Sequence, residues 1–325
     1  MRKIIAVLSA SLVLVLGIAP AQASTDPTIV IIDSGFNLSQ ISNNVVQEVC
    51  ITAFSGCNNG LNFEIGTGSA QTDIAIAPRF RSDWNHGTTM ALSAIAVNPN
   101  IKLIVIRNAR VYSSGNVLFG NQTSLESALQ WVLDNKQQYN IAGVLMARGS
   151  NSHSMANTAS RGFMIQAQIY STQLEKMQSN PSLFRASIVK FSRLLNDVRT
   201  NLAALPDIAC PASTLVASLV SQLQTNNVAT IFATGNDYNN RYVDSPACLD
   251  QAVSVTAANA DRKILQLANV APNTDFAVLA PNTSVASATL AGKWSLLYNG
   301  SYNSTYALLS SNGTNSGSWN TLFIP

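Results

Sequence analysis

Three short stretches of the sequence each carry a side chain that can take part in acyl transfer. An apolar run ends at Asp33, His86 lies in Asn-His-Gly-Thr, and Ser284 lies in Asn-Thr-Ser-Val-Ala-Ser. A serine hydroxyl is a weak nucleophile until a neighbouring base takes its proton, and that base needs a third group to fix its orientation. A carboxylate, an imidazole and a hydroxyl fill these three roles, so together they indicate nucleophilic hydrolysis.

Each of these side chains is expected at the end of a strand or the start of a helix. Residues 28–32 are an apolar β-branched run typical of a buried parallel strand, and Asp33 follows it directly. The runs after His86 and Ser284 are expected to be helical. A helix that starts at Ser284 would favour the negative charge of a developing oxyanion.

The remaining apolar runs predict the sheet that positions these ends. Strands are expected at 101–106, 141–147, 228–233 and 252–257, and residues 123–135 have the spacing of an amphipathic helix. Strands that alternate with helices predict a parallel sheet covered on both faces, with the functional site at the carboxyl ends of the strands.

These motifs resemble the subtilisin-like serine proteases, in which the chain order is also Asp, His, Ser. The resemblance covers about residues 28 to 310. It implies an α/β fold of three layers, α/β/α, with a central mostly parallel sheet, and the activity of a secreted serine endopeptidase. By the same resemblance Asp33 orients His86, His86 is the general base and then the general acid, and Ser284 forms the acyl-enzyme.

The resemblance extends to the groups around the reacting atoms. Phe232 to Asn236 is similar to the segment that supplies an oxyanion-hole asparagine, so Asn236 and the Ser284 N–H are expected to donate to the oxyanion. The strand from Val144 is similar to the one that pairs with extended substrate. Two segments are then expected to line the primary specificity pocket: Ala147, Arg148 and Gly149, and Ala233, Thr234 and Gly235. Arg148 is either a rim residue or a side chain that favours acidic substrate residues.

The third motif departs from the family pattern. Asn282 stands where the family has glycine, and Ala280-Pro281 is fused to Thr283-Ser284 where the family has a loop and a hairpin. In an alternative alignment the nucleophile would be lost or shifted to Ser301, which would make the protein a catalytically impaired, secreted binding module. We favour Ser284 because we expect a helix behind it and none behind Ser301. An esterase that uses the same triad is a third reading.

The N-terminus is typical of a secretory signal. Arg2 and Lys3 precede an apolar run over residues 4–18, and Ala21-Gln22-Ala23 is a small-x-small cleavage motif. We therefore expect a signal peptide at 1–23, a peptidase domain at 24–325, and export to the periplasm or the extracellular space. An uncleaved membrane anchor is the alternative, and no stable membrane insertion is expected after cleavage.

Four cysteines in an exported chain favour disulfides. Three pairings are open, and we favour Cys50 with Cys57 and Cys210 with Cys248. A zinc site is the alternative, but the spacing lacks a tight Cys-x-x-Cys and the chain has only two histidines. The proposed chemistry requires no cofactor. Calcium sites are common in the family, but no acidic loop here matches one.

The composition fits a folded domain with a protein or peptide substrate. The chain is 47% hydrophobic and 11% charged, which disfavours global disorder. A net charge of +3, two units of which lie in the signal, gives no basic face for nucleic acid. Residues 155–209 are polar with helical patterns at 165–177 and 183–202, and we interpret them as an insertion in the domain. A monomer is expected.

Overall fold

The computed structural model describes residues 26–72, 85–111, 117–149, 181–203, 209–316 and 321–325. The strands of its main sheet are β1 (Thr28–Asp33), β2 (Val45–Ile51), β3 (Phe63–Ile65), β4 (Lys102–Arg107), β7 (Ile141–Met146), β8 (Ala229–Ala233), β9 (Val253–Ala258), β10 (Phe276–Leu279), β11 (Thr314–Asn315) and β12 (Leu322–Ile324). A separate hairpin pairs β5 (Ala109–Val111) with β6 (Val117–Phe119). The helices are η1 (Leu38–Gln40), α1 (His86–Val97), α2 (Gln122–Asn135), α4 (Pro181–Ala203), α5 (Thr214–Thr225), α6 (Thr283–Leu297) and α7 (Tyr302–Asn312).

The described strands form one mostly parallel sheet. Their order is β11-β12-β10-β9-β8-β7-β1-β4-β2-β3, and neighbours pair in parallel except for β11 and β3 at the two edges. The strands expected at 28–32, 101–106, 141–147, 228–233 and 252–257 are β1, β4, β7, β8 and β9. The predicted three-layer α/β/α fold is confirmed.

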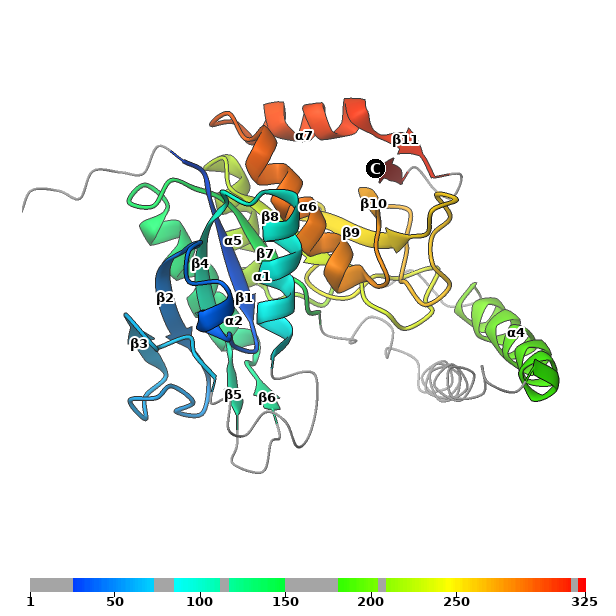
Figure 1. Cartoon of the computed structure of the whole chain (residues 1–325). Coiled ribbons are helices and arrows are strands. Elements are labelled where there is room, and N and C mark those ends of the chain that lie inside the picture. Colours follow the sequence, from blue (N-terminus) through cyan, green and yellow to red (C-terminus); the bar gives the residue numbers. More distant parts are fainter. Residues whose placement is uncertain (1–25, 73–84, 112–116, 150–180, 204–208, 317–320) are drawn as a thin grey trace, which may run out of the picture.

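Helices cover both faces of this sheet, as Figure 1 shows. Side chains alternate across β1, so Ile29 and Ile31 pack in the core under α1 and α6, whereas Val30 and Ile32 pack in the core under α2 and α5. A strand that is buried on both faces must be apolar at every position. This requirement explains the continuous apolar run that precedes Asp33.

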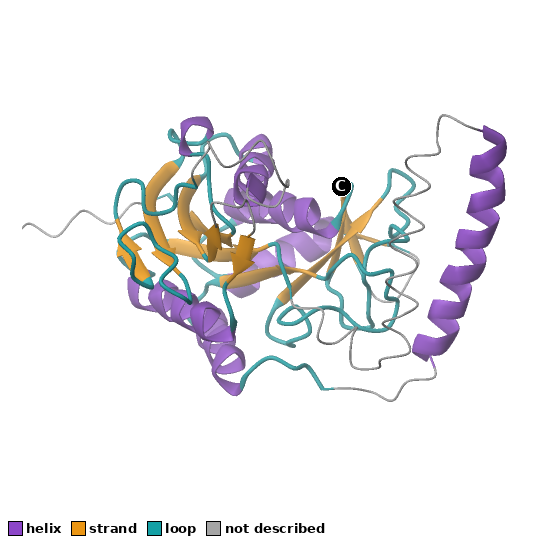
Figure 2. Ribbon diagram, turned by 90° about the horizontal axis from the view of Figure 1, so that it is seen from below, coloured by secondary structure: helices purple, strands orange, loops and turns teal. Residues whose placement is uncertain are grey.

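Helix α4 belongs to the insertion predicted for residues 155–209 and contains the helix expected at 183–202. It lies at the side of the molecule (Figure 2). Phe191 and Leu195 of α4 pack with Tyr238, and the ring centroids of Phe191 and Tyr238 are 5.6 Å apart. The helix expected at 165–177 lies outside the described residues.

The C-terminal region has more regular structure than the sequence analysis expected. Behind Ser301, where no helix was expected, α7 spans Tyr302–Asn312, and β11 and β12 add to the sheet. Tyr302 is buried with its ring 5.4 Å from that of Trp294, and Phe323 is buried beside β10. These tertiary contacts outweigh the weak local preferences of a segment rich in serine and asparagine.

Both favoured disulfides are present, Cys50–Cys57 and Cys210–Cys248. The second joins the segment before α5 to the loop between β8 and β9. Among the described residues no helix is long and apolar enough to span a bilayer. The signal peptide expected at 1–23 lies outside them.

Candidate active site

Asp33 is the last residue of β1, at the carboxyl edge of the sheet. Its side chain is buried, and its Oδ1 accepts a hydrogen bond of 2.6 Å from the Ser34 N–H. The Asn108 N–H donates to the Asp33 carbonyl at 2.7 Å. The carboxylate is therefore held by the backbone turn that ends the strand.

His86 is the first residue of α1 and lies directly against Asp33. Its Nδ1 is 2.9 Å from both carboxylate oxygens of Asp33, and 27% of its side chain is exposed. The next two residues, Gly87 and Thr88, hold the start of α1 close to β1. A Cβ atom at Gly87 would sit 2.6 Å from the Gly35 carbonyl oxygen, and Thr88 Oγ1 accepts a hydrogen bond of 2.8 Å from the Asn37 N–H.

The pKa of Asp33 reflects two opposing influences. Burial alone would raise it, but the charge of His86 and hydrogen bonds from His86 and Ser34 outweigh burial and hold the pKa of Asp33 below its ordinary value. Asp33 therefore remains ionised beside the imidazole. In this arrangement the carboxylate favours the tautomer with the proton on Nδ1, in which Nε2 carries the lone pair.

Ser284 lies in the first turn of α6. Asn282 caps this helix, and its side chain accepts from the Val285 N–H at 2.9 Å. The backbone of Asn282 has φ −161° and ψ 171°, an extended conformation that any residue adopts, so the absence of glycine here causes no strain. The Ser284 hydroxyl donates to the carbonyl of Ala147, just beyond β7, at 2.9 Å.

Asn236, just after β8, lies beside the start of α6. Its Oδ1 accepts a hydrogen bond of 3.1 Å from the Thr283 N–H. This bond identifies the acceptor end of the amide, so the NH2 end is left to donate elsewhere. Within the described part of the chain the Ser284 N–H has no hydrogen-bond partner. The two expected oxyanion donors, Asn236 Nδ2 and Ser284 N, therefore lie at the same helix start.

Helices α1 and α6 pack tightly and begin at the same edge of the sheet (Figure 1). A Cβ atom at Gly292 would lie 2.7 Å from the Ala94 carbonyl oxygen, so only glycine permits this separation. Trp294 is fully buried, and its Nε1 donates to the Ala142 carbonyl in β7. Close packing of α6 on β7 thus places the start of α6 at Ala147, and packing on α6 holds α1 beside it.

Ser301 lies at the other edge of the sheet. It caps α7, and the N–H of the next residue, Tyr302, donates to Asn227, which precedes β8. Residues 285–297 of α6 separate it from Ser284, a helix length of about 20 Å. The expectation that no helix follows Ser301 is wrong, because α7 begins directly after it. Ser301 nevertheless lies at the edge of the sheet opposite to Asp33 and His86.

No family model and no curated protein matches this sequence. Solved structures do match. A protease from Pseudoalteromonas arctica is 13% identical with a TM-score of 0.60, over 92% of this chain and 87% of that one. A cold-adapted subtilisin-like serine proteinase is 15% identical with a TM-score of 0.50, over 93% and 90%. The prenylagaramide maturation protease PagA is 14% identical with a TM-score of 0.55, over 93% and 92%.

The chain has a subtilisin-like fold. The resemblance that the sequence motifs suggested is therefore confirmed at the level of the fold. Because identities of 13–15% carry no residue roles, what each side chain does has to be argued from the geometry of the site.

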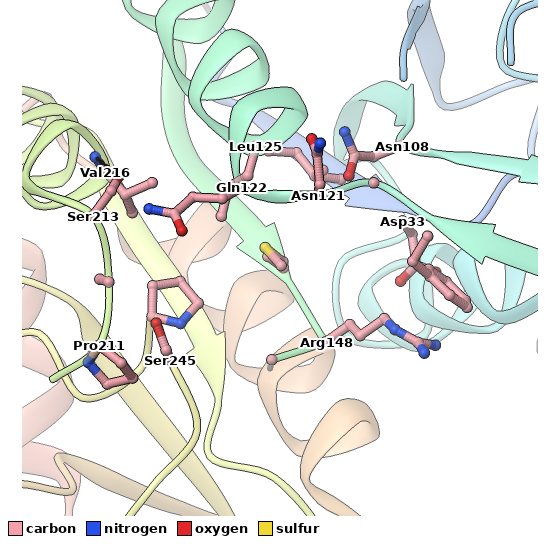
Figure 3. Close-up of a pocket in the computed structure, with 17 residues that line it drawn as sticks. Asp33, Asn108, Asn121, Gln122, Leu125, Arg148, Pro211, Ser213, Val216 and Ser245 are labelled. Carbon is pink, nitrogen blue, oxygen red and sulfur yellow. Dashed lines mark hydrogen bonds between the residues drawn. The ribbon is translucent and has the colours of Figure 1, made fainter. Parts of the chain in front are cut away.

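A cavity of about 480 Å³ borders Asp33. Figure 3 shows its labelled lining side chains, among them Asp33, Asn108, Leu125, Arg148 and Ser245. The Arg148 guanidinium lies 3.0 Å from the centroid of the Phe119 ring and reaches toward the side on which Asp33 lies. Arg148 is exposed, so its charge faces the cavity rim.

The two segments expected to line the specificity pocket lie on either side of an acidic group that the sequence prediction missed. A Cβ atom at Gly149 would sit 2.5 Å from Asp244 Cβ, and one at Gly235 would sit 2.5 Å from Asp244 Oδ2. Asn269 Nδ2 donates to Asp237 at 3.3 Å and to Asp244 at 3.4 Å. The only signal in the sequence was an aspartate just before Ser245-Pro246.

Among the described residues, no group of three or more histidine, cysteine, aspartate or glutamate side chains is arranged to hold a metal ion. Asp237 and Asp244 form a pair of carboxylates, and the side chain that lies between them is the amide of Asn269 and not a third acid.

Proposed function

We propose that this protein is a secreted serine endopeptidase that uses Asp33, His86 and Ser284 as its catalytic triad. The observation that carries the proposal is the 2.9 Å contact of His86 Nδ1 with both oxygens of buried Asp33, at the edge where α6 presents Ser284. Proteins of the same fold that are described as proteases support peptides as the substrate class.

The proposed reaction gives each of these groups one role. His86 Nε2 takes the Ser284 proton while Oγ bonds to the peptide carbonyl carbon, and the carbonyl oxygen becomes an oxyanion. Asn236 Nδ2 and the Ser284 N–H donate to that oxyanion. The C–N bond then breaks, His86 returns the proton to the leaving amine, and water releases the acyl group by the same steps. No cofactor enters this chemistry.

Export is the second part of the proposal. Two disulfides persist in an oxidising compartment, and the N-terminal sequence is typical of a secretory signal. We place the mature protein in the periplasm or outside the cell.

One observation favours a non-catalytic alternative. The Ser284 hydroxyl donates to the Ala147 carbonyl, and a hydroxyl has a single proton to donate. If the Ser284 hydroxyl never exchanged this hydrogen bond for one to His86, the protein would bind peptides without cleaving them.

Labelling with a fluorophosphonate probe separates the two functions, because the probe reacts only with an activated serine. We expect the purified protein to be labelled, and the Ser284→Ala variant not to be. Ser301→Ala is the matched control and should be labelled as strongly as the wild type, since Ser301 caps α7 at the opposite edge.

Hydrolysis of casein by the same three proteins completes the test. Loss of turnover in Ser284→Ala by at least about 10³-fold is expected for removal of a triad nucleophile. A folded wild-type protein that is neither labelled nor active would favour the binding module. Labelling with hydrolysis of small esters alone would favour an esterase.

A further inference from the structure

A groove of about 830 Å³ lies along the exposed face of α2, and the proposed chemistry does not use it. Its large apolar side chains come from the loop after β2, from β3, from α2 and from α5, and they are Phe54, Phe63, Trp131 and Leu215. Phe54 is 53% exposed, Phe63 is 47% exposed and Leu215 is 49% exposed. Large apolar side chains that gather on one exposed surface mark a place where a partner binds.

Phe54 is held in its exposed position at a conformational cost. Its φ is +67°, in the left-handed region that bulky side chains disfavour. The Arg110 guanidinium donates to the Phe54 carbonyl at 2.8 Å, and the Cys50–Cys57 disulfide closes the loop that contains Phe54. A strained conformation that the surroundings impose on a residue outside the core is typical of a functional surface.

The charged side chains of this groove are both acidic. Glu126 and Asp134 line it, and its described lining contains no lysine or arginine. Glu126 Oε1 accepts a hydrogen bond of 2.6 Å from the Ser213 hydroxyl, and Asp134 Oδ1 accepts one of 2.8 Å from Gln130 Nε2. These donors are neutral and do not cancel either negative charge, so the groove attracts a cationic side chain.

The groove adjoins the cavity that borders Asp33. Asn121, which caps α2, lines both of them. Ser213, which caps α5, lines the cavity, and its hydrogen-bond partner Glu126 lines the groove. Figure 3 shows Asn121 and Ser213 among the side chains around the cavity. A polypeptide that leaves the cavity across the starts of α2 and α5 therefore enters the groove.

We propose that this groove binds a second segment of the polypeptide substrate, away from the scissile bond. It selects a segment that carries aromatic or large aliphatic side chains together with lysine or arginine. The inference rests on the proposed function and adds its substrate class, which is an extended polypeptide and not a short peptide.

The length of α2 sets the length of that segment. Between Gln122 and Asp134 the helix axis rises about 18 Å, which an extended chain covers with about five to six residues. Because this segment and the scissile bond belong to one chain, binding in the groove raises the effective concentration of the scissile bond at Ser284.

Removal of the two exposed rings tests the apolar part of the groove. In Phe54→Ala/Phe63→Ala we expect the KM for casein to rise about 10-fold or more with little change in kcat, because binding remote from the reacting atoms is lost. The rate at which a fluorophosphonate probe labels Ser284 should not change, since the probe is too small to reach the groove. Leu308→Ala removes an exposed apolar side chain on α7 and should change neither quantity.

Peptide binding tests the charge of the groove and does not depend on catalysis. Fluorescent hexapeptides of sequence Ala-Phe-Lys-Ala-Phe-Lys, Ala-Phe-Glu-Ala-Phe-Glu and Ala-Ser-Lys-Ala-Ser-Lys are titrated into Ser284→Ala and followed by anisotropy. We expect the first peptide to bind about 10-fold more tightly than either of the others. Adding Glu126→Gln/Asp134→Asn should remove its preference over the glutamate peptide. Adding Asp250→Asn, at an exposed position outside the groove, should not.

The outcomes separate the groove from the catalytic proposal. A lysine preference that requires Glu126 and Asp134, in a protein whose wild type is neither labelled nor active, would support the groove and reject the peptidase. Casein cleavage that the ring variant leaves unchanged, or an equal fall in casein cleavage and in labelling, would overturn the groove. A lysine preference that survives in folded Glu126→Gln/Asp134→Asn would also overturn it. If the ring variant does not fold, the peptide titration decides, and the absence of both binding and cleavage would overturn both proposals.

Discussion

Asp33 and Asp244 are both buried carboxylates, yet their surroundings shift their pKa values in opposite directions. Asp33 has the imidazole of His86 at 2.9 Å and a short bond from the Ser34 N–H, so its pKa is lowered. At Asp244 burial raises the pKa, and the charge of nearby Asp237 raises it further. Burial acts in the same direction at both positions, and at Asp33 the partners outweigh it.

This difference predicts how Asp244→Asn affects stability at different pH values. The folded-state pKa of Asp244 lies above its unfolded value, so the wild type loses stability as the pH rises between the two. Asparagine does not titrate. The Tm of Asp244→Asn should match that of the wild type near pH 4 and exceed it at pH 8, by about 2–4 °C for each kcal/mol of relief.

Differential scanning fluorimetry between pH 4 and pH 8 measures this effect. Asp250→Asn, at an exposed position, should shift the Tm little and equally at each pH. A Tm for Asp244→Asn that falls below that of the wild type as the pH rises would show that the fold stabilises Asp244 as an anion.

At the scale of elements, the geometry of the candidate site depends on how α1 packs against α6. His86 and Ser284 lie in the first turns of these helices. The close approach of Gly292 to Ala94 sets the distance between the helices. A substitution in the middle of either helix is therefore expected to move His86 relative to Ser284, although it contacts neither side chain.

Gly292→Ala is expected to lower both stability and activity. Alanine is the better helix former by about 1 kcal/mol, but its Cβ would lie 2.7 Å from the Ala94 carbonyl oxygen and 2.8 Å from Val97 Cβ. Overpacking against backbone costs about 1–3 kcal/mol, so the clash outweighs the propensity. We expect a lower Tm and a fall in kcat that exceeds any change in KM.

Leu296→Ala is the control on the same helix, because Leu296 is 57% exposed; it should change neither quantity. Adding Val97→Ala to Gly292→Ala removes one of the two close contacts and should recover part of the Tm. If Gly292→Ala were as stable and as active as the wild type, the spacing of these helices would not control the site.

The strands that the sequence predicted are those whose residues are buried on both faces. Continuous apolar runs are sufficient to predict β1, β4 and β7 from the sequence. The sequence analysis missed β2, which contains Gln47 and Glu48, and β10, which has only four residues. Their assignment depends on pairing with β4 and β9, which a local pattern does not contain.

The candidate triad could be predicted because each member lies in its own local motif. The position of Asp244 could not be predicted, because the segments after β7 and β8 bring Gly149 and Gly235 to either side of it. Ser301 could not be excluded from the sequence alone either, because its distance from Ser284 depends on the length of α6. Local motifs indicate the candidate residues, and the fold determines which of them lie together.

At the scale of the whole molecule, the two disulfides close loops of different length. Cys50 and Cys57 are 7 residues apart, whereas Cys210 and Cys248 are 38 apart. The longer loop contains α5, β8, Asn236 and Asp244. Loop-closure entropy grows with the logarithm of loop length, so the longer link restricts the unfolded chain more, by about 1.5 kcal/mol.

Removing each disulfide by paired cysteine-to-alanine substitution tests this difference. Loss of Cys210–Cys248 should cost about 2–5 kcal/mol, and loss of Cys50–Cys57 should cost less. Urea denaturation of both variants and the wild type gives the free energies of unfolding. An equal or larger loss for the short loop would mean that native-state contacts, rather than chain entropy, dominate.

The hydrogen bond from Ser284 to the Ala147 carbonyl has a consequence for the timing of reactivity. While the serine proton is committed to that carbonyl, it is not available to His86. Ala147 ends the strand that an extended peptide would join, so an arriving backbone N–H competes for the same oxygen. The resting enzyme would then be latent, and the peptide to be cut would itself release the nucleophile.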